Sequence, residues 1–196
     1  MAVALFAAAV AFGASTAGAQ RSSPATAAPP AVAKAGEAYI AKARADSIRH
    51  PYTEADIEFM YNMIGHHAQA IVMSRWAPTH GASASVQTLA ERIINAQQDE
   101  IRTMQQWLLD RSQPVPVPSL TGGPMKMLMG GQTMEMLMPG MLTDERMKEL
   151  DGARGEEFDR LFRTDRNQHH RGAVSMVRDL FGSYGAAQDE IVFKFA

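Results

Sequence analysis

Apolar residues recur at helical spacing in two long adjacent stretches of this chain. Intervals of three and four residues place them on one stripe over Thr53–Trp76 and on a second stripe over Ser85–Asp110. Thr53 and Asp56 have the spacing of a capping box, which marks the start of the first stretch. Because the connection between the stretches is short, the pattern predicts an antiparallel helical hairpin.

The first stretch is repeated further along the chain. Five of its positions, including a doubled histidine, recur at one constant offset, which indicates an internal duplication. The matched residues are Phe59, His66, His67, Ala70 and Met73, and then Phe162, His169, His170, Ala173 and Met176. Two such hairpins predict an all-α four-helix bundle without strands of useful length. In this bundle His66 faces inward, close to the helix that carries His169.

The remaining segments differ in composition from the two hairpins. The N-terminal segment is apolar and ends in small residues, as a secretory signal does, and an Ala/Pro-rich linker follows it. Prolines and paired glycines interrupt the chain between the hairpins, so an irregular crossover is expected there. The expected boundaries are 1–19 for the signal, 20–50 for the linker, 51–196 for the bundle domain, about 53–110 for the first hairpin, 111–142 for the crossover and about 143–196 for the second hairpin.

The second hairpin is shorter than the first. Residues 188–196 correspond to the approach and first turn of the Ser85–Asp110 helix, and nothing corresponds to residues 91–108. We therefore expect the last helix of the bundle to be missing or truncated. The open apolar face would let copies of the chain associate as homo-oligomers.

Charge and composition exclude several classes of function. The chain has 19 Lys and Arg against 21 Asp and Glu, without long runs of either sign, which argues against nucleic acid as a partner. It has no cysteine, so disulfides and thiolate metal sites are excluded. No Glu stands three residues before a His, which argues against a di-iron oxidase, and no other catalytic motif is present. We expect a protein that is not an enzyme and that, once the signal is cleaved, has no membrane contact.

Methionine and histidine carry the candidate chemistry. Met60, Met63 and His67 lie within a narrow arc of the first predicted helix, and His66 lies on the adjoining stripe. Thioethers prefer Cu(I), whereas imidazole also binds Cu(II) and Zn, so this mixture favours a copper ion, with Cu(I) ahead of Cu(II) or Ag(I). The candidate metal ligands are Met60, Met63, His66, His67, Met73, Met104, His169, His170 and Met176.

Two further features rank the candidate sites. Arg163 and Arg166 flank the second histidine pair, and their charge should make it the weaker copper site. The crossover carries methionines in M-x-M-x-M clusters between Met125 and Met141, with no obvious core to fill. They form a second candidate for Cu(I) or Ag(I), and capping of the open bundle end explains them equally well.

The same residues also have a structural explanation. Methionine at helical spacing most often fills a core, and a histidine on an apolar face is most often a hydrogen-bonded core residue. Consecutive histidines point about 100° apart on a helix, so packing alone does not explain why both are repeated. The alternative function is a metal-free structural or partner-binding bundle with a polar histidine core. His50 and His80, at predicted helix ends, are expected to be solvated.

The doubled motif resembles that of a bacterial exported family known as domain of unknown function 305. The resemblance runs from about Thr53 to the C-terminus. It is carried by Phe59, Met63–Ile64, His66–His67, Ala70–Ile71, Met73, Ala90, Ile93–Ile94, Gln97, Glu100–Ile101, Met104 and Trp107–Leu108. It implies a ferritin-like bundle and, because some members are similar to periplasmic copper-binding proteins, copper buffering, transfer or tolerance in the periplasm or outside the cell. The chain departs from the family pattern at Arg163, Arg166 and Asn167.

Overall fold

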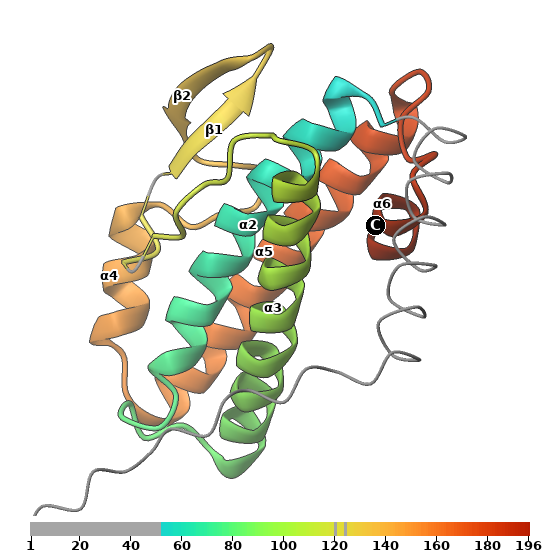
Figure 1. The fold of residues 1–196 in the computed structure, drawn as a ribbon. Coiled ribbons are helices and arrows are strands. Elements are labelled where there is room, and N and C mark those ends of the chain that lie inside the picture. Colours follow the sequence, from blue (N-terminus) through green and yellow to red (C-terminus); the bar gives the residue numbers. More distant parts are fainter. Residues whose placement is uncertain (1–51, 120, 124) are drawn as a thin grey trace, which may run out of the picture. The chain divides into compact units, whose positions relative to one another are not determined.

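Five helices and one β-hairpin make up the described part of the structure, a computed structural model in which residues 52–119, 121–123 and 125–196 are described (Figure 1). The elements are α2 (Glu54–Arg75), α3 (Ala84–Asp110), β1 (Met125–Met129), β2 (Gln132–Met136), α4 (Asp144–Gly152), α5 (Gly155–Gly182) and α6 (Glu190–Phe195). None of these helices is long and apolar enough to cross a membrane. The predicted signal and linker, and His50, lie outside the described residues.

The start of α2 is fixed by the capping box that the sequence predicts. The Thr53 side chain accepts a hydrogen bond from the Asp56 amide, and the Asp56 carboxylate accepts one from the Thr53 amide at 2.7 Å. The second oxygen of Asp56 accepts from the Ala187 amide at 2.7 Å. This buried carboxylate therefore also holds the segment before α6 against the start of α2.

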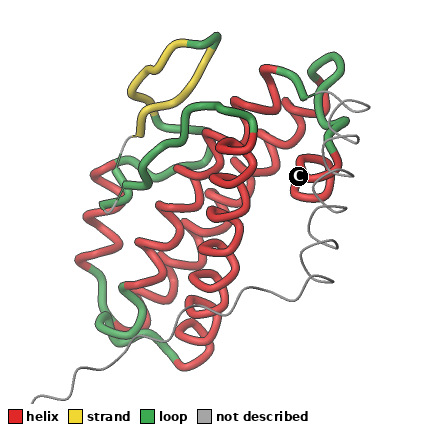
Figure 2. Tube along the Cα trace, viewed as in Figure 1, coloured by secondary structure: helices red, strands yellow, loops and turns green. Residues whose placement is uncertain are grey.

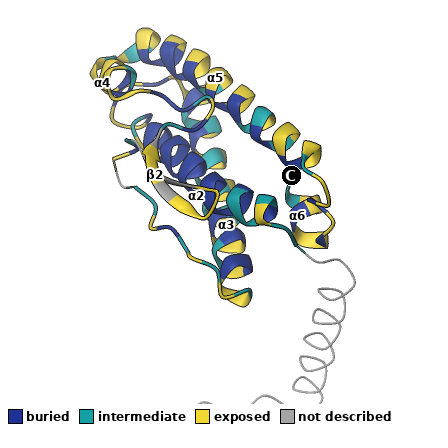
Figure 3. Ribbon diagram, turned by 90° about the horizontal axis from the view of Figure 1, so that it is seen from above, coloured by how far each residue is buried: buried dark blue, intermediate teal, exposed yellow. Residues whose placement is uncertain are grey.

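Helix α2 lies between α3 and α5 and is the most deeply buried element (Figures 1 and 3). Every residue from Phe59 to Ser74 is buried, whereas α3 and α5 each bury a single stripe. The crossover adds to this burial, because the Gln69 amide donates to the carbonyl oxygens of Gly122 and Leu142 at 2.6 and 3.0 Å. The side chains of α2 therefore pack against both neighbouring helices.

The crossover contains regular structure, which corrects the prediction of an irregular segment without useful strands. Strands β1 and β2 pair antiparallel, with Met127 opposite Met134 (Figure 2). Gly130 and Gly131 connect them with φ angles of 54° and 72°, the left-handed values that a tight two-residue hairpin turn requires. The Gly130 amide donates to Glu58 at 2.6 Å, which ties the turn to α2.

The all-α bundle class is confirmed, with this hairpin as the small exception. Helix α2 begins and ends within one residue of the predicted Thr53–Trp76, and α3 begins one residue before the predicted Ser85 and ends at Asp110 as predicted. In the described part of the chain, three helices exceed 20 residues, and α6 has only 6. The ferritin-like arrangement of four long helices stays a prediction.

Candidate metal centre

Three of the four histidines of the duplicated motif lie close together in the core. His66 on α2 and His169 on α5 lie with ring centroids 3.7 Å apart, and His67 lies with its ring centroid 6.5 Å from that of His66. All three side chains are buried, whereas His170 is exposed. The prediction that His66 faces inward, close to the helix that carries His169, is confirmed.

His66 is fixed by the crossover. Its Nε2 donates a hydrogen bond to the Pro139 carbonyl oxygen at 3.1 Å, so in the neutral ring the lone pair lies on Nδ1. The pKa of His66 is lowered to about 4, chiefly by burial and then by repulsion from His67, against the opposing effect of the Pro139 hydrogen bond. The ring is therefore neutral throughout the physiological pH range.

His67 is oriented by α3. Its Nε2 donates to the Glu100 carboxylate at 2.9 Å, and its Nδ1 is buried without a hydrogen-bond partner. The Phe195 ring of α6 lies with its centroid 6.1 Å from the His67 ring. In metal sites, a carboxylate often accepts a hydrogen bond from one nitrogen of a histidine and so orients the other nitrogen toward the metal. His67 has this arrangement, with its second nitrogen free.

His169 likewise has one nitrogen without a partner. Its Nε2 is buried and unpaired, so the hydrogen bond of this ring to the His66 backbone involves the other nitrogen. Burial lowers the pKa of His169 well below its ordinary value, and repulsion from His66 and His67 adds to this, while the backbone hydrogen bond opposes it. His169 thus presents a neutral nitrogen that can accept a ligand bond.

The predicted methionine ligands divide between two apolar clusters of the core. All of them are buried. Met60, Met63, Met104 and Met176 belong to the apolar cluster that also contains Phe59 and Leu180. Met73 belongs to a second cluster, with Phe158 and Phe162. The sequence treats the two histidine pairs as a stronger and a weaker site, but the structure brings His66 and His169, one from each pair, into a single cluster.

A small cavity of about 60 Å³ opens beside His169, between α2, α3 and α5. Its lining includes Met73 and Ser74 from α2, Gln97 from α3 and Arg166 from α5. The sequence does not identify Ser74 as a site residue and gives Gln97 only as part of the family motif. Yet Ser74 Oγ and Gln97 Oε1 are, like His169 Nε2, buried without a partner. A cavity of this size has room for an ion or a few waters that would satisfy these atoms.

Comparison with known proteins identifies the family. The profile of the family described as domain of unknown function (DUF305) matches residues 56–195. The chain belongs to the DUF305 family. No curated protein matches it.

Two solved structures of DUF305 proteins resemble this one. The first, described as a putative secreted protein DUF305 from Streptomyces coelicolor, is 28% identical, with a TM-score of 0.55 over 72% of this chain and 81% of that chain. The second, a DUF305 fragment from Deinococcus radiodurans, is 22% identical, with a TM-score of 0.57 over 74% of this chain and 87% of that chain, and shows the likeness of fold.

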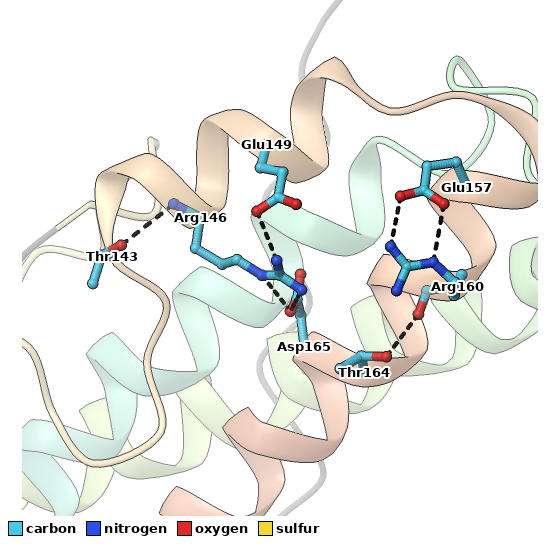
Figure 4. Close-up of polar contacts among 7 residues, drawn as sticks. All are labelled: Thr143, Arg146, Glu149, Glu157, Arg160, Thr164 and Asp165. Carbon is cyan, nitrogen blue, oxygen red and sulfur yellow. Dashed lines mark hydrogen bonds and ion pairs between the residues drawn. The ribbon is translucent and has the colours of Figure 1, made fainter.

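An ion-pair network holds α5 of this DUF305 chain against α4 (Figure 4). The Arg146 guanidinium donates to Asp165 at 2.8 Å and to Glu149 at 2.6 Å. Burial raises the pKa of Asp165, against the opposing hydrogen bond from Arg146. Asp165 lies one helical turn before His169, so this network fixes the part of α5 that carries the candidate ligand. The neighbouring pair Glu157–Arg160 is exposed.

His80 corrects another prediction. The sequence places it at a solvated helix end, but it is buried, and its Nε2 contacts the Asp151 carbonyl oxygen at 2.8 Å and the Asp151 carboxylate at 2.9 Å. It therefore ties the turn after α2 to the end of α4. No local sequence pattern predicts this contact of His80, because its partner Asp151 lies far along the chain.

The described residues hold no cluster of ionisable metal ligands. Among those residues, no three His, Asp or Glu side chains come together as a group that could hold a metal ion. A metal bound at the histidine cluster would therefore need thioether or amide ligands as well. Thioether ligands are soft and select copper over hard cations such as Mg or Ca, whereas amide oxygens are hard ligands.

Proposed function

We propose that this DUF305 protein binds copper, with Cu(I) favoured over Cu(II) or Ag(I), in order to buffer or pass the ion. The observation that carries the proposal is a pair of buried imidazole nitrogens without protein partners, His67 Nδ1 and His169 Nε2, on the two rings that neighbour His66. Burying a polar atom without a hydrogen bond is costly, and a bound metal ion would remove that cost.

The surroundings of these nitrogens fit a copper ion. Glu100 orients His67, and the His66 backbone orients His169, so each free nitrogen is the one that would face a ligand. Met60, Met63, Met73, Met104 and Met176 are buried in the two apolar clusters of the bundle. Their thioethers would supply soft ligands that remain unprotonated, and copper bound there would be shielded from water.

We further propose that the protein acts outside the cytoplasm and that its role is binding and not catalysis. One structural neighbour is described as a putative secreted protein, and the N-terminal segment has the composition of a secretory signal. The exposed Met129 and Met134 of the β-hairpin form the second candidate site, because accessible thioethers suit rapid exchange of Cu(I).

The alternative is a metal-free bundle in which the histidines form a polar core. It is favoured by the hydrogen bonds that His66 makes to Pro139 and His67 makes to Glu100. Those bonds satisfy one nitrogen of each ring and join three segments of the fold. This alternative predicts that removing a histidine lowers stability without changing copper affinity.

Competition titration with a Cu(I) chelator separates the two functions. In the full chain, His67→Ala and His169→Ala should each weaken Cu(I) binding by at least about tenfold. His80→Ala is the matched control, because it removes a buried and hydrogen-bonded histidine outside the cluster. It should lower the melting temperature but leave the Cu(I) affinity unchanged. Equal affinities in all variants, or a wild-type chain that cannot compete for Cu(I), would contradict the proposal.

A further inference from the structure

The cavity beside His169 combines unpaired polar atoms with a positive charge. Ser74 Oγ from α2 and Gln97 Oε1 from α3 are buried at this cavity without a hydrogen-bond partner. Ser74 is almost fully buried, with 1% of its surface exposed. Folded proteins rarely leave buried polar atoms unsatisfied, so these atoms point to an occupant of the cavity.

The charge of the lining specifies the sign of this occupant. Arg166 of α5 lines the cavity, whereas no described Asp or Glu does. Arg166 is half-buried and makes no ion pair with another residue of the described chain. A guanidinium that is partly withdrawn from water is stabilised by a negatively charged partner. An anion in the cavity would be that partner, and a cation there would be repelled.

The neutral polar groups of the lining can also hold an anion. The Ser74 hydroxyl can donate a hydrogen bond, and the Gln97 amide can turn so that its NH₂ group faces the cavity. Together with Arg166, they bring hydrogen-bond donors from three helices to one place. His169 also lines the cavity, but its unpaired Nε2 carries a lone pair and does not donate to the anion. That nitrogen therefore stays available to copper.

The rest of the lining indicates the kind of anion. Met73, Ile93 and Phe162 contribute apolar surface, which suits a short alkyl group better than a second charged group. The guanidinium of Arg166 presents paired N–H groups whose spacing matches the two oxygens of a carboxylate. Its single permanent charge balances a single negative charge. The volume of about 60 Å³ restricts the occupant to a small molecule.

We propose that this cavity binds a small monocarboxylate. The carboxylate group would lie on Arg166, Ser74 and Gln97, and the short alkyl group would contact Met73 and Ile93. The inference goes beyond the proposed copper function and does not depend on it, because none of the three residues that hold the carboxylate belongs to the proposed copper site.

Titration of the metal-free full chain with propionate, followed by NMR of the backbone amides, tests this inference. The buffer contains a metal chelator that does not bind the protein and no other small carboxylate or phosphate. Propionate should bind saturably, and the amide signals that shift should include those of Ser74 and Gln97. Arg166→Gln should weaken this binding by at least about tenfold, because it removes both the charge and the paired donors.

Arg163→Gln is the matched control for Arg166→Gln. Arg163 lies on the same helix, but it is exposed, donates to the Asp159 carbonyl oxygen and does not line the cavity. Removing its charge should therefore leave the propionate affinity unchanged. Ser74→Ala removes one neutral donor and should weaken binding by about threefold to tenfold. Melting temperatures close to that of the wild type show that the variants fold.

Competition with inorganic anions tests the carboxylate specificity. Chloride and sulfate lack an alkyl group and should displace propionate only at much higher concentrations than acetate does. A wild-type chain without saturable propionate binding, unchanged binding in Arg166→Gln, an equal loss in Arg163→Gln, or displacement by chloride as effective as by acetate would overturn the inference. Because no copper is present, none of these results bears on the proposed function, which the Cu(I) competition titration tests separately.

Discussion

At the scale of single residues, the close contact of His66 and His169 shapes the chemistry of the core. Their ring centroids are 3.7 Å apart and both rings are buried, so a proton on either ring would be poorly solvated and would repel a proton on the other. Neutral imidazoles keep a lone pair free at a pH where an exposed histidine is protonated. The arrangement therefore keeps these imidazole nitrogens unprotonated in mildly acidic surroundings.

The lowered pKa of His66 predicts how stability depends on pH in the metal-free protein. Between pH 6.5 and about 4 the unfolded chain binds a proton at this residue that the folded chain does not bind. The free energy of unfolding should therefore be highest above pH 6.5 and fall as the pH drops to about 4, by about 3 kcal/mol for this residue. Urea unfolding at a series of pH values measures it. His66→Gln should show a shallower dependence, and a wild-type curve that is flat over this range would contradict the prediction.

Met63 tests whether a core methionine is also a ligand. Met63→Leu keeps nearly the same volume, so it should cost less than about 1.5 kcal/mol of stability. Because it removes a thioether, it should weaken Cu(I) binding more than Cu(II) binding. Met147→Leu is the control, since Met147 is also buried but lies on α4 and belongs to the other apolar cluster. If Cu(I) and Cu(II) binding weaken equally in Met63→Leu, Met63 only fills the core.

At the scale of elements, the return of the crossover across α5 holds the histidine cluster in place. Gly172 of α5 has no room for a side chain, because a Cβ atom there would overlap the Pro139 carbonyl group. Gly140, the residue after Pro139, has a φ of +78° and lies directly against Gly172. The same Pro139 carbonyl oxygen accepts the hydrogen bond from His66. The close approach of Gly140 and Gly172 thus sets the position of the Pro139 carbonyl oxygen, which accepts the hydrogen bond from His66.

Because of this contact, adding a single methyl group at Gly172 should destabilise the protein. Gly172→Ala should push the crossover away from α5, break the His66–Pro139 hydrogen bond and lower the free energy of unfolding by about 1–3 kcal/mol. The control is Gly152→Ala, because nothing lies within 4 Å of a Cβ atom at Gly152. It should leave stability unchanged or raise it slightly, since alanine favours helix over glycine. Thermal unfolding of both variants measures the difference, and similar melting temperatures would contradict the packing described here.

At the scale of the whole molecule, the helices and their inward faces are the features that the periodicity of the sequence predicts. The 3.6-residue pattern predicts α2 and α3 to within one residue at each end, and the duplication correctly predicts that His66 faces the helix of His169. The β-hairpin had a local signal that was missed, namely alternating methionines on both sides of Gly130–Gly131.

Other features depend on contacts between distant segments and have no local signal. The partner of His80 lies 71 residues away at Asp151, and the cavity gathers Ser74, Gln97 and Arg166 from three helices. How each helix is rotated about its own axis is set by packing in the folded chain. The spacing of residues in the sequence therefore does not reveal which side chains meet at the cavity. The helices of the fold are therefore more predictable than the details of the site.

X-ray absorption at the copper edge of the Cu(I)-loaded protein tests the central claim most directly. The chain contains no cysteine, so any sulfur bound to copper must come from a methionine thioether. Binding at the buried cluster predicts both imidazole nitrogen and thioether sulfur in the first coordination shell. Copper that is lost on desalting, or that is surrounded by nitrogen and oxygen alone, would contradict a mixed histidine and methionine site.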